Sequence, residues 1–305
     1  MKKEQYWEDY WQSDGQAGEV LLNSGGDKPR YLVEFWQDLF RGLDSCEVYD
    51  LACGAGSIYE SLGSSIRTDF ELFGVDVSGE ALEILKQRMP EVQAIRSRSQ
   101  GLPFEDQSLG YCVSQFGIEY AGIDGFREVA RVLKKGGRAT FLCHIENGYI
   151  DRRNKKYLDG ANLVVSSNYI DTAKNLTRAL FKADQSEIER CKAEFEKSEA
   201  LLSKEIGSNV NGIHEHIFHG FRQLLQRYSA YYESDIVGWL VANEADVEKN
   251  IAKVSNIKDV SLNQDKKDVI EQIFREAGFS EIKFEDFYGH QDSKLPVAVK
   301  LQLHN

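Results

Sequence analysis

The sequence predicts an α/β protein, with a mainly parallel sheet covered by helices on both faces and a long helical insertion. Strand-like and helix-like runs alternate between residues 47 and 145, which is typical of parallel sheets. The alternation breaks over residues 149–263, where apolar residues recur at helical spacing and few strand signals occur. A helix and two strands follow in residues 264–305, so two pieces of one sheet bracket the insertion.

The composition favours a soluble protein that binds neither nucleic acid nor membrane. The 305 residues carry a formal net charge of −12, which disfavours a surface that follows a phosphate backbone. The N-terminus lacks the apolar core of a signal peptide, and no apolar run approaches the length of a membrane span. The five cysteines are an odd number without paired spacing, so we expect a reducing, cytoplasmic setting.

Aromatic residues dominate the first predicted helix, over residues 4–12. Tyr6 and Tyr10 form an i,i+4 pair on its surface, and Trp7 and Trp11 form another. A short helix with so many exposed aromatic rings must dock on another part of the protein. Two alternatives stay open: the helix packs on the core of the domain, or it forms a lid over a ligand.

A strand that ends in a glycine turn is the centre of the predicted site. The strand over residues 47–51 places Asp50 at its end, and Gly54 and Gly56 follow in a turn that feeds a helix. A dinucleotide site would have a third glycine where Tyr59 stands, so this reading is disfavoured. A carboxylate beside the turn suits a cation better than a pyrophosphate.

The remaining elements follow from the same patterns. After the helix over residues 57–62, the second strand ends near Asp76, and Ser78 opens the next helix. The run Lys134-Lys135-Gly136-Gly137 is typical of a cationic last helical turn followed by glycine caps. The predicted helices are 30–43, 78–89, 125–133 and 266–277, and the predicted strands are 70–77, 92–95, 109–116, 138–145, 282–288 and 297–303.

Several of these segments together resemble one family. The Asp50–Ser57 turn resembles motif I of the class I S-adenosylmethionine-dependent methyltransferases, and three further segments follow in that family's order. The resemblance covers about residues 31–148 and 264–305. It implies a Rossmann-like three-layer sandwich whose seven-stranded sheet has its last strand antiparallel, with residues 1–30 as an N-terminal lid helix and linker. The further segments are Phe73–Ser78, Leu102–Phe104 and Arg131–Arg138, and Phe274–Phe279 near the C-terminus.

The resemblance implies S-adenosyl-L-methionine as cofactor. Asp50 would hold its methionine half, Asp76 would accept hydrogen bonds from both ribose hydroxyls, and Gln115 would flank the sulfonium. The acid that usually contacts the adenine is replaced by Arg98, and Gly110 replaces another acid, so backbone groups near Ser99 would serve instead. The full predicted set is Asp50, Ala52, Gly54, Gly56, Asp76, Val77, Ser99, Gln100, Gln115, Tyr6 and Tyr10.

Candidates for a general base follow the fourth and fifth strands. They are Glu119, Tyr120 and His144. An imidazole is the side chain best matched to proton transfer near neutral pH, although a histidine at a strand end also serves as a hydrogen-bonded structural group. The Asn-Pro-Pro-aromatic signature of nucleic-acid amino-methyltransferases is absent, since Ser114–Gly117 stands in its place.

The resemblance leads us to expect a methyltransferase that acts on a small-molecule acceptor at an oxygen, nitrogen or carbon atom. The insertion, residues 149–263, would cap the acceptor site and is also a candidate surface for a homodimer. His214, His216 and His219 in it do not have metal-ligand spacing, so no metal is predicted. Two alternatives stay open: a protein methyltransferase, and a protein that binds S-adenosylmethionine or S-adenosylhomocysteine without turnover.

Overall fold

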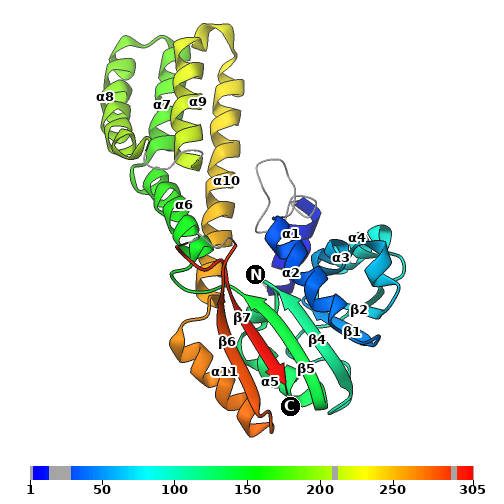
Figure 1. Ribbon diagram of the computed structural model, residues 1–305. Helices are drawn as coiled ribbons and strands as arrows, with labels where there is room; N and C mark the ends of the chain where they lie inside the picture. The colour runs from blue at the N-terminus through cyan, green and yellow to red at the C-terminus, as the bar shows by residue number, and fades with distance from the viewer. Residues whose placement is uncertain (1–2, 14–28, 208–211, 290–293, 305) are drawn as a thin grey trace. The chain divides into compact units, whose positions relative to one another are not determined.

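The computed structural model describes residues 3–13, 29–207, 212–289 and 294–304. The chain divides into two compact units. Residues 1–150 and 260–305 form the sheet unit, and residues 151–259 form the helical unit. The two units are described separately below. Figure 1 shows the strands and helices of each unit, coloured along the chain.

Seven strands form one sheet in the order β3-β2-β1-β4-β5-β7-β6. All neighbouring pairs from β3 to β5 are parallel, whereas β7 is antiparallel to both β5 and β6. The prediction of a mostly parallel sheet with its last strand antiparallel is therefore confirmed. The strands are β1 (Glu47–Leu51), β2 (Glu71–Asp76), β3 (Gln93–Arg96), β4 (Leu109–Gln115), β5 (Leu133–Cys143), β6 (Glu281–Phe287) and β7 (Ala298–His304).

Helices cover both faces of the sheet because apolar residues alternate along its strands. Tyr49, Leu51 and Val75 project into one core, together with apolar residues of α5 and α11. On the opposite face, a side chain at Gly74 would collide with Leu85 of α4. The helices of this unit are α1 (Lys3–Ser13), α2 (Arg30–Arg41), α3 (Ser57–Arg67), α4 (Gly79–Arg88), η1 (Ile118–Ala121, a 3₁₀ turn), α5 (Gly122–Val132) and α11 (Gln264–Glu276).

The predicted helix is present, but its predicted glycine cap at Lys134–Gly137 is wrong. The helix α5 ends at Val132, and β5 already begins at Leu133, which pairs with Leu109 of β4. The two lysines and two glycines therefore lie inside an irregular stretch of β5, where the register shifts between Leu109 and Tyr111. Strand pairing over this long distance overrides the local preference for a glycine cap.

The helical unit is built around its own aromatic core. Tyr169, Phe195 and Phe221 are buried in van der Waals contact, with ring centroids 5.2 to 6.2 Å apart. No described helix of the chain is long and apolar enough to cross a membrane. The helices are α6 (Tyr149–Ser166), α7 (Tyr169–Lys182), α8 (Gln185–Leu202), η2 (Ser203–Glu205), α9 (Ile213–Gln226), η3 (Tyr228–Ala230) and α10 (Glu233–Val260).

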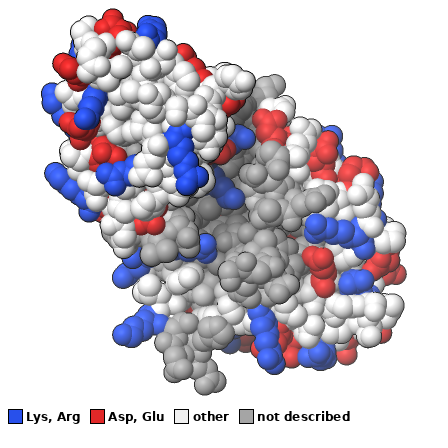
Figure 2. Space-filling view, turned by 90° about the horizontal axis from the view of Figure 1, so that it is seen from above, with Lys and Arg blue, Asp and Glu red and all other residues white. Residues whose placement is uncertain are grey.

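Charged side chains of both signs are interspersed over the described surface that Figure 2 presents. On this face, lysine and arginine do not form a continuous basic track among the described residues. This distribution agrees with the acidic net charge of −12 and gives no support to nucleic-acid binding.

Candidate active site

The turn after β1 is strained and tightly packed. Ala52 has φ 56°, Gly54 φ 53° and Gly56 φ 84°, all in the left-handed region. A Cβ atom at Gly54 would lie 2.5 Å from the indole of Trp11, and one at Gly56 would lie 2.3 Å from a methyl carbon of Leu85. Only glycine fits at these two positions, so the backbone of the turn is open to close approach from α1 and from α4.

Asp76, at the end of β2, is tied directly to this turn. Its Oδ2 accepts a hydrogen bond of 2.8 Å from the N–H of Gly54, and its Oδ1 accepts one of 2.9 Å from the N–H of Ser78. Burial raises the pKa of Asp76, and these backbone donors oppose that rise. The Ser78 hydroxyl accepts from the N–H of Ala81, which confirms Ser78 as the helix N-cap.

Asp50 lies on the other side of the same turn. It is 1% exposed and lies within β1, beside Gly74 of β2 and Val113 of β4 in the register. The thiol of Cys53, between the two acids in sequence, has a pKa raised by burial and then by the charges of Asp76 and Asp50. Both carboxylates are therefore close to one turn and act on it electrostatically.

Tyr59 explains why the third glycine of a dinucleotide site is missing. Its side chain is fully buried, and its hydroxyl lies 2.9 Å from the carbonyl oxygens of both Val48 and Phe73. The hydroxyl thus ties β1 to β2 beneath the turn. The phenol ring of Tyr59 therefore stands where a dinucleotide site has a glycine, which lets the helix pack closely at the pyrophosphate.

The end of β4 is joined to the end of β1. The Ser114 hydroxyl donates to the Leu51 carbonyl at 2.6 Å and accepts from the N–H of Ile118 at 3.0 Å. A Cβ atom at Gly117 would lie 2.5 Å from the Ala52 carbonyl oxygen. Phe116 has φ 52°, a second non-glycine residue in the left-handed region at a strand end.

Gln115 is held by side chains within the sheet unit. The indole N–H of Trp36 donates to its amide oxygen at 2.6 Å, and its amide nitrogen donates to the Ser57 hydroxyl at 3.1 Å. These two bonds fix the amide orientation between α2 and the start of α3. Contact of Gln115 with a sulfonium stays a prediction.

Glu119 and His144 form a buried pair at the ends of η1 and β5. Oε1 of Glu119 lies 2.7 Å from Nδ1 of His144 and also accepts the His144 backbone N–H at 2.9 Å. The side chains are 0% and 1% exposed. Among the described residues, Nε2 of His144 and Oε2 of Glu119 have no hydrogen-bond partner. A buried polar atom without a partner is costly, so this nitrogen at the strand ends is a candidate for contact with a ligand.

Aromatic rings surround this pair. The His144 ring lies 4.7 Å from the Phe116 ring and 5.8 Å from the Tyr120 ring, centroid to centroid. Trp7 of α1 lies 4.9 Å from Tyr120 in an edge-to-face contact. Burial raises the pKa of Tyr120 well above its usual range, and the charge of Glu119 raises it further. Tyr120 is therefore a neutral phenol rather than a base near pH 7.

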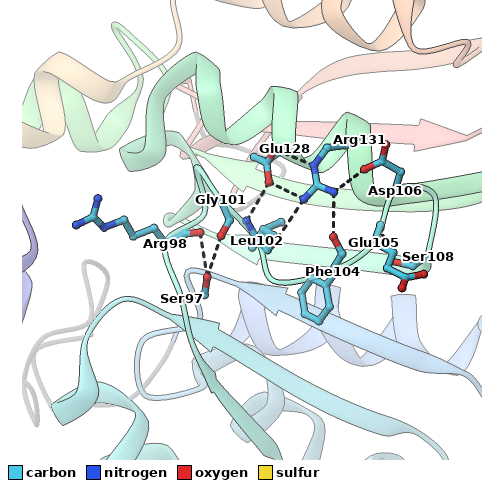
Figure 3. Close-up of polar contacts among 10 residues, drawn as sticks. All are labelled: Ser97, Arg98, Gly101, Leu102, Phe104, Glu105, Asp106, Ser108, Glu128 and Arg131. Carbon is cyan, nitrogen blue, oxygen red and sulfur yellow. Dashed lines mark hydrogen bonds and ion pairs between the residues drawn. The ribbon is translucent and has the colours of Figure 1, made fainter.

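An arginine fixes the loop between β3 and β4 (Figure 3). The guanidinium of Arg131 makes a bidentate pair with Glu128 at 2.8 and 2.9 Å, and it donates to the carbonyls of Leu102 and Phe104. Glu128 in turn accepts the Leu102 N–H at 2.9 Å. Both backbone groups of Leu102 are thus held by side chains of α5.

The predicted cofactor residues of this loop lie next to that anchored segment. Ser99 is buried, and Gln100 is exposed and donates to the Ala121 carbonyl at 3.1 Å. Val77 is half-buried between Asp76 and Ser78. Tyr6 and Tyr10 lie on α1, each in edge-to-face contact with Trp7. A contact of these residues with a cofactor stays a prediction.

Comparisons of the sequence with known proteins found methyltransferases. Residues 48–137 match the family model described as a methyltransferase domain. A demethylmenaquinone methyltransferase of Lactococcus lactis subsp. lactis is 29% identical over 139 residues, 40% of this chain and 54% of the relative. Residues 48–137 are thus a methyltransferase domain, as the resemblance to the class I S-adenosylmethionine-dependent enzymes predicted.

The comparisons also found a second curated methyltransferase and a solved structure. The ubiquinone/menaquinone biosynthesis C-methyltransferase UbiE of Campylobacter jejuni is 29% identical over 134 residues, 38% of this chain and 57% of the relative. The chain thus spans little more than half the length of these curated relatives. A solved SAM-dependent methyltransferase from Aquifex aeolicus shares 18% identity over 39% of this chain and 69% of its own, with a TM-score of 0.34.

The residues of this methyltransferase fit S-adenosylmethionine. Two buried carboxylates, Asp50 and Asp76, flank a turn whose glycine backbone permits close approach. Acidic groups complement an ammonium and a sulfonium and accept hydrogen bonds from ribose hydroxyls, whereas they would repel a pyrophosphate. The nearby cation Arg96, at the end of β3, is already paired with Glu8 of α1 at 2.5 Å.

Two histidines of the helical unit pack against residues of that unit. His214 is buried against Gly160 within the helical unit, and His216 contacts the ring of Trp239 at 5.7 Å. Within the part of the chain that the structure describes, no group of three metal-ligating side chains converges. The role of this unit as a substrate cap or a dimer surface stays a prediction.

The structure adds three residues that the sequence patterns did not single out. Glu8 joins α1 to α4, Ser114 joins β1 to β4, and Trp36 orients Gln115. These three contacts span 63 or more positions along the chain, so no local periodicity could have identified them. The aromatic pairs of α1 were a weak signal, because they predicted that this helix docks.

Proposed function

We propose that this methyltransferase transfers a methyl group from S-adenosylmethionine to a small molecule and that His144 removes a proton from the acceptor. The observation that carries the proposal is the buried Glu119–His144 pair at the carboxyl ends of β4 and β5. Open α/β sheets bind their ligands at this edge, so the pair lies on the same side of the sheet as the turn after β1.

The hydrogen bonds of Glu119 define the state of the imidazole. A carboxylate can only accept, so the contact of 2.7 Å requires a proton on Nδ1 of His144. The neutral ring then carries its lone pair on Nε2, which is the nitrogen without a partner among the described residues. The second bond, from the His144 backbone N–H to the same oxygen, holds the carboxylate in place.

The chain has two tasks in the reaction, alignment and proton removal. Bound S-adenosylmethionine would supply an electrophilic methyl group. Nε2 of His144 would take the proton from the acceptor group as that group bonds to the methyl carbon and the bond from this carbon to sulfur breaks, which leaves S-adenosylhomocysteine. Glu119 would stabilise the imidazolium that forms. The half-buried aromatic rings of Phe116 and Tyr120 would help to exclude water from the reacting atoms.

The neighbours of His144 favour an uncharged acceptor with an ionisable hydroxyl on an aromatic ring. Phe116, Tyr120 and Trp7 provide ring faces and edges, and Glu119 would repel an anionic acceptor. Two relatives carry names that refer to demethylmenaquinone and to ubiquinone or menaquinone biosynthesis. Hydroxylated aromatic compounds are therefore the first acceptor class to test, ahead of amines and peptides.

The experiment combines a binding measurement with an acceptor screen. Calorimetry with S-adenosylhomocysteine should show binding by the wild type, and Asp76→Ala should weaken it about tenfold to a hundredfold, because two hydrogen bonds to an ionised group are lost. Mass spectrometry should then detect methylated product from hydroxylated aromatic acceptors. His144→Ala should retain binding and lose turnover.

Other outcomes would contradict the proposal at separate points. A wild-type protein that binds neither S-adenosylmethionine nor its product would remove the cofactor assignment. Binding without transfer to any small molecule or peptide would favour a non-catalytic binding protein. Transfer to peptides alone would favour a protein methyltransferase. Full turnover in His144→Ala would remove that residue as the base.

A further inference from the structure

The carboxylate of Glu8 occupies the N-terminus of α4 from a helix about 70 residues away in sequence. It accepts hydrogen bonds from the Ser78 hydroxyl at 2.8 Å, the Gly79 N–H at 3.0 Å and the Glu80 N–H at 3.2 Å. The guanidinium of Arg96 lies 2.5 Å away. The first turn of a helix attracts anions through its free N–H groups, so all four donors converge on one charge.

The contacts of Glu8 lie beside the predicted cofactor residues. Ser78 and Gly79 directly follow Val77, and the Ser78 N–H also binds Asp76. The same side chain therefore holds the loop that carries the proposed ribose-binding acid. Figure 1 shows α1 beside α4 within the sheet unit, in agreement with their packing contacts.

Two tryptophans of α1, one on each side of Glu8 in the sequence, contact residues of the candidate site. Trp7, the residue directly before it, contacts Tyr120, whose ring lies next to His144. Three residues after it, the Trp11 indole lies against the backbone of Gly54. One anchored helix therefore covers the glycine turn and the aromatic wall of the Glu119–His144 pair together.

Glu8 makes four polar contacts from α1 to α4 and to Arg96, and Gln12 adds a longer bond of 3.3 Å to Glu80. Isolated helices of this length are marginal in water, so α1 depends on its docking contacts. Charge-assisted hydrogen bonds are about twice as strong as neutral ones.

We propose that Glu8 is a positioning residue whose carboxylate latches α1 over the cofactor site and thereby sets the rate at which S-adenosylhomocysteine leaves. Only the part of this inference that concerns the release of S-adenosylhomocysteine rests on the proposed function. Release requires the Glu8 bonds to open, because Trp11 and Trp7 otherwise stay in contact with Gly54 and Tyr120. The docking of α1 through Glu8 is a property of the free protein as well.

The test uses Glu8→Gln, which keeps the size of the side chain and removes its charge. The matched control is Glu83→Gln on α4, where the carboxylate is exposed and its ion pair with Lys86 is 3.7 Å long. Hydrogen exchange of residues 3–13 in the free protein reports docking of α1. Stopped-flow tryptophan fluorescence reports the release rate of S-adenosylhomocysteine, and the thermal midpoint reports the fold.

We expect Glu8→Gln to accelerate both the exchange of residues 3–13 and the release of S-adenosylhomocysteine about tenfold, with Glu83→Gln like the wild type. Glu8→Asp should restore part of the slow release. Equal exchange in Glu8→Gln and Glu83→Gln would overturn the latch. Faster exchange with unchanged release would overturn its role in cofactor retention. If the wild type does not bind S-adenosylhomocysteine, the proposed function is contradicted. The hydrogen exchange of residues 3–13 then still tests whether Glu8 holds α1 in place.

Discussion

Two buried histidines, one in each unit of this protein, have opposite environments. His144 in the sheet unit and His214 in the helical unit are both 1% exposed. His144 is held by two bonds to one oxygen of Glu119, and only its Nε2 lacks a described partner. Neither ring nitrogen of His214 has a partner among the described residues, and its ring lies directly against Gly160.

The comparison shows that burial alone does not make a histidine a candidate base. A carboxylate partner fixes the tautomer and orientation of His144 and leaves one nitrogen ready to accept a proton. His214 has no such orienting group, so its burial reflects close packing between α6 and α9. The predictions below test this difference, beginning with the largest expected effect.

Replacing His144 should have the largest effect on activity. His144→Ala should lower kcat for an acceptor that must ionise about 10²- to 10⁴-fold, because general base catalysis contributes that much. Binding of S-adenosylhomocysteine should change little. Glu119→Gln should lower kcat less, since it keeps an acceptor oxygen for the backbone N–H but removes the charge that stabilises the imidazolium. A His214→Leu variant with the same loss of kcat would break the comparison.

The two histidines should also differ in their contribution to the free energy of unfolding, although they are equally buried. His144→Leu leaves the Glu119 carboxylate buried without its partner and should lower the free energy of unfolding by roughly 3–5 kcal/mol. His214→Leu removes two unbonded polar atoms from an apolar core and should change it by about 1 kcal/mol or less, in either direction. Urea denaturation of both variants measures the difference, and equal losses would contradict it.

The sequence predicted those residues of the candidate site that stand in a recognisable local pattern. Asp50 and Asp76 come at the ends of apolar strand runs, and Gly54 and Gly56 stand in the turn between strand and helix. Such signals extend over only a few residues, and parallel strands bring their carboxyl ends to one edge. The mainly parallel direction of the strands, with the last one antiparallel, follows from the alternation and from the family resemblance.

Pairings between distant segments could not be predicted in the same way. Glu119 and His144 were both candidates, but that one orients the other follows only from the register of β4 and β5. The contact of Glu8 with α4 spans about 70 residues. The misplaced helix end at Lys134–Gly137 has the same cause, because Leu133 pairs with Leu109 instead of capping a helix.

Gly160 offers a direct test of the packing around His214. A Cβ atom there would lie 2.2 Å from Nδ1 of His214, and the buried ring has no room to move away. Gly160→Ala should therefore lower the free energy of unfolding by about 1–3 kcal/mol. The double variant Gly160→Ala/His214→Ala should recover part of this loss relative to His214→Ala alone. Additive losses in that double-mutant cycle would show that the two residues are not in contact.

The smallest effect concerns two acids of the sheet unit with opposite pKa shifts. Burial raises the pKa of Glu8, but hydrogen bonds from Gly79, Ser78 and Glu80, together with the charge of Arg96, outweigh burial and lower it. A carboxylate with a lowered pKa stabilises the folded state above its ordinary pKa. This contribution is lost as the pH falls through the lowered value.

Asp76 should titrate above the ordinary range of an aspartate, because burial raises its pKa. On acidification, affinity for S-adenosylhomocysteine should therefore fall at a pH above that range, as Asp76 takes up a proton and ceases to accept two ribose hydrogen bonds. Hydrogen exchange of residues 3–13 should become faster only below the ordinary range of a glutamate, when Glu8 is protonated, because its pKa is lowered. Calorimetry and hydrogen exchange over the same pH series measure the two midpoints. Exchange that becomes faster above the ordinary range of a glutamate would contradict the role of the Glu8 charge in the docking of α1.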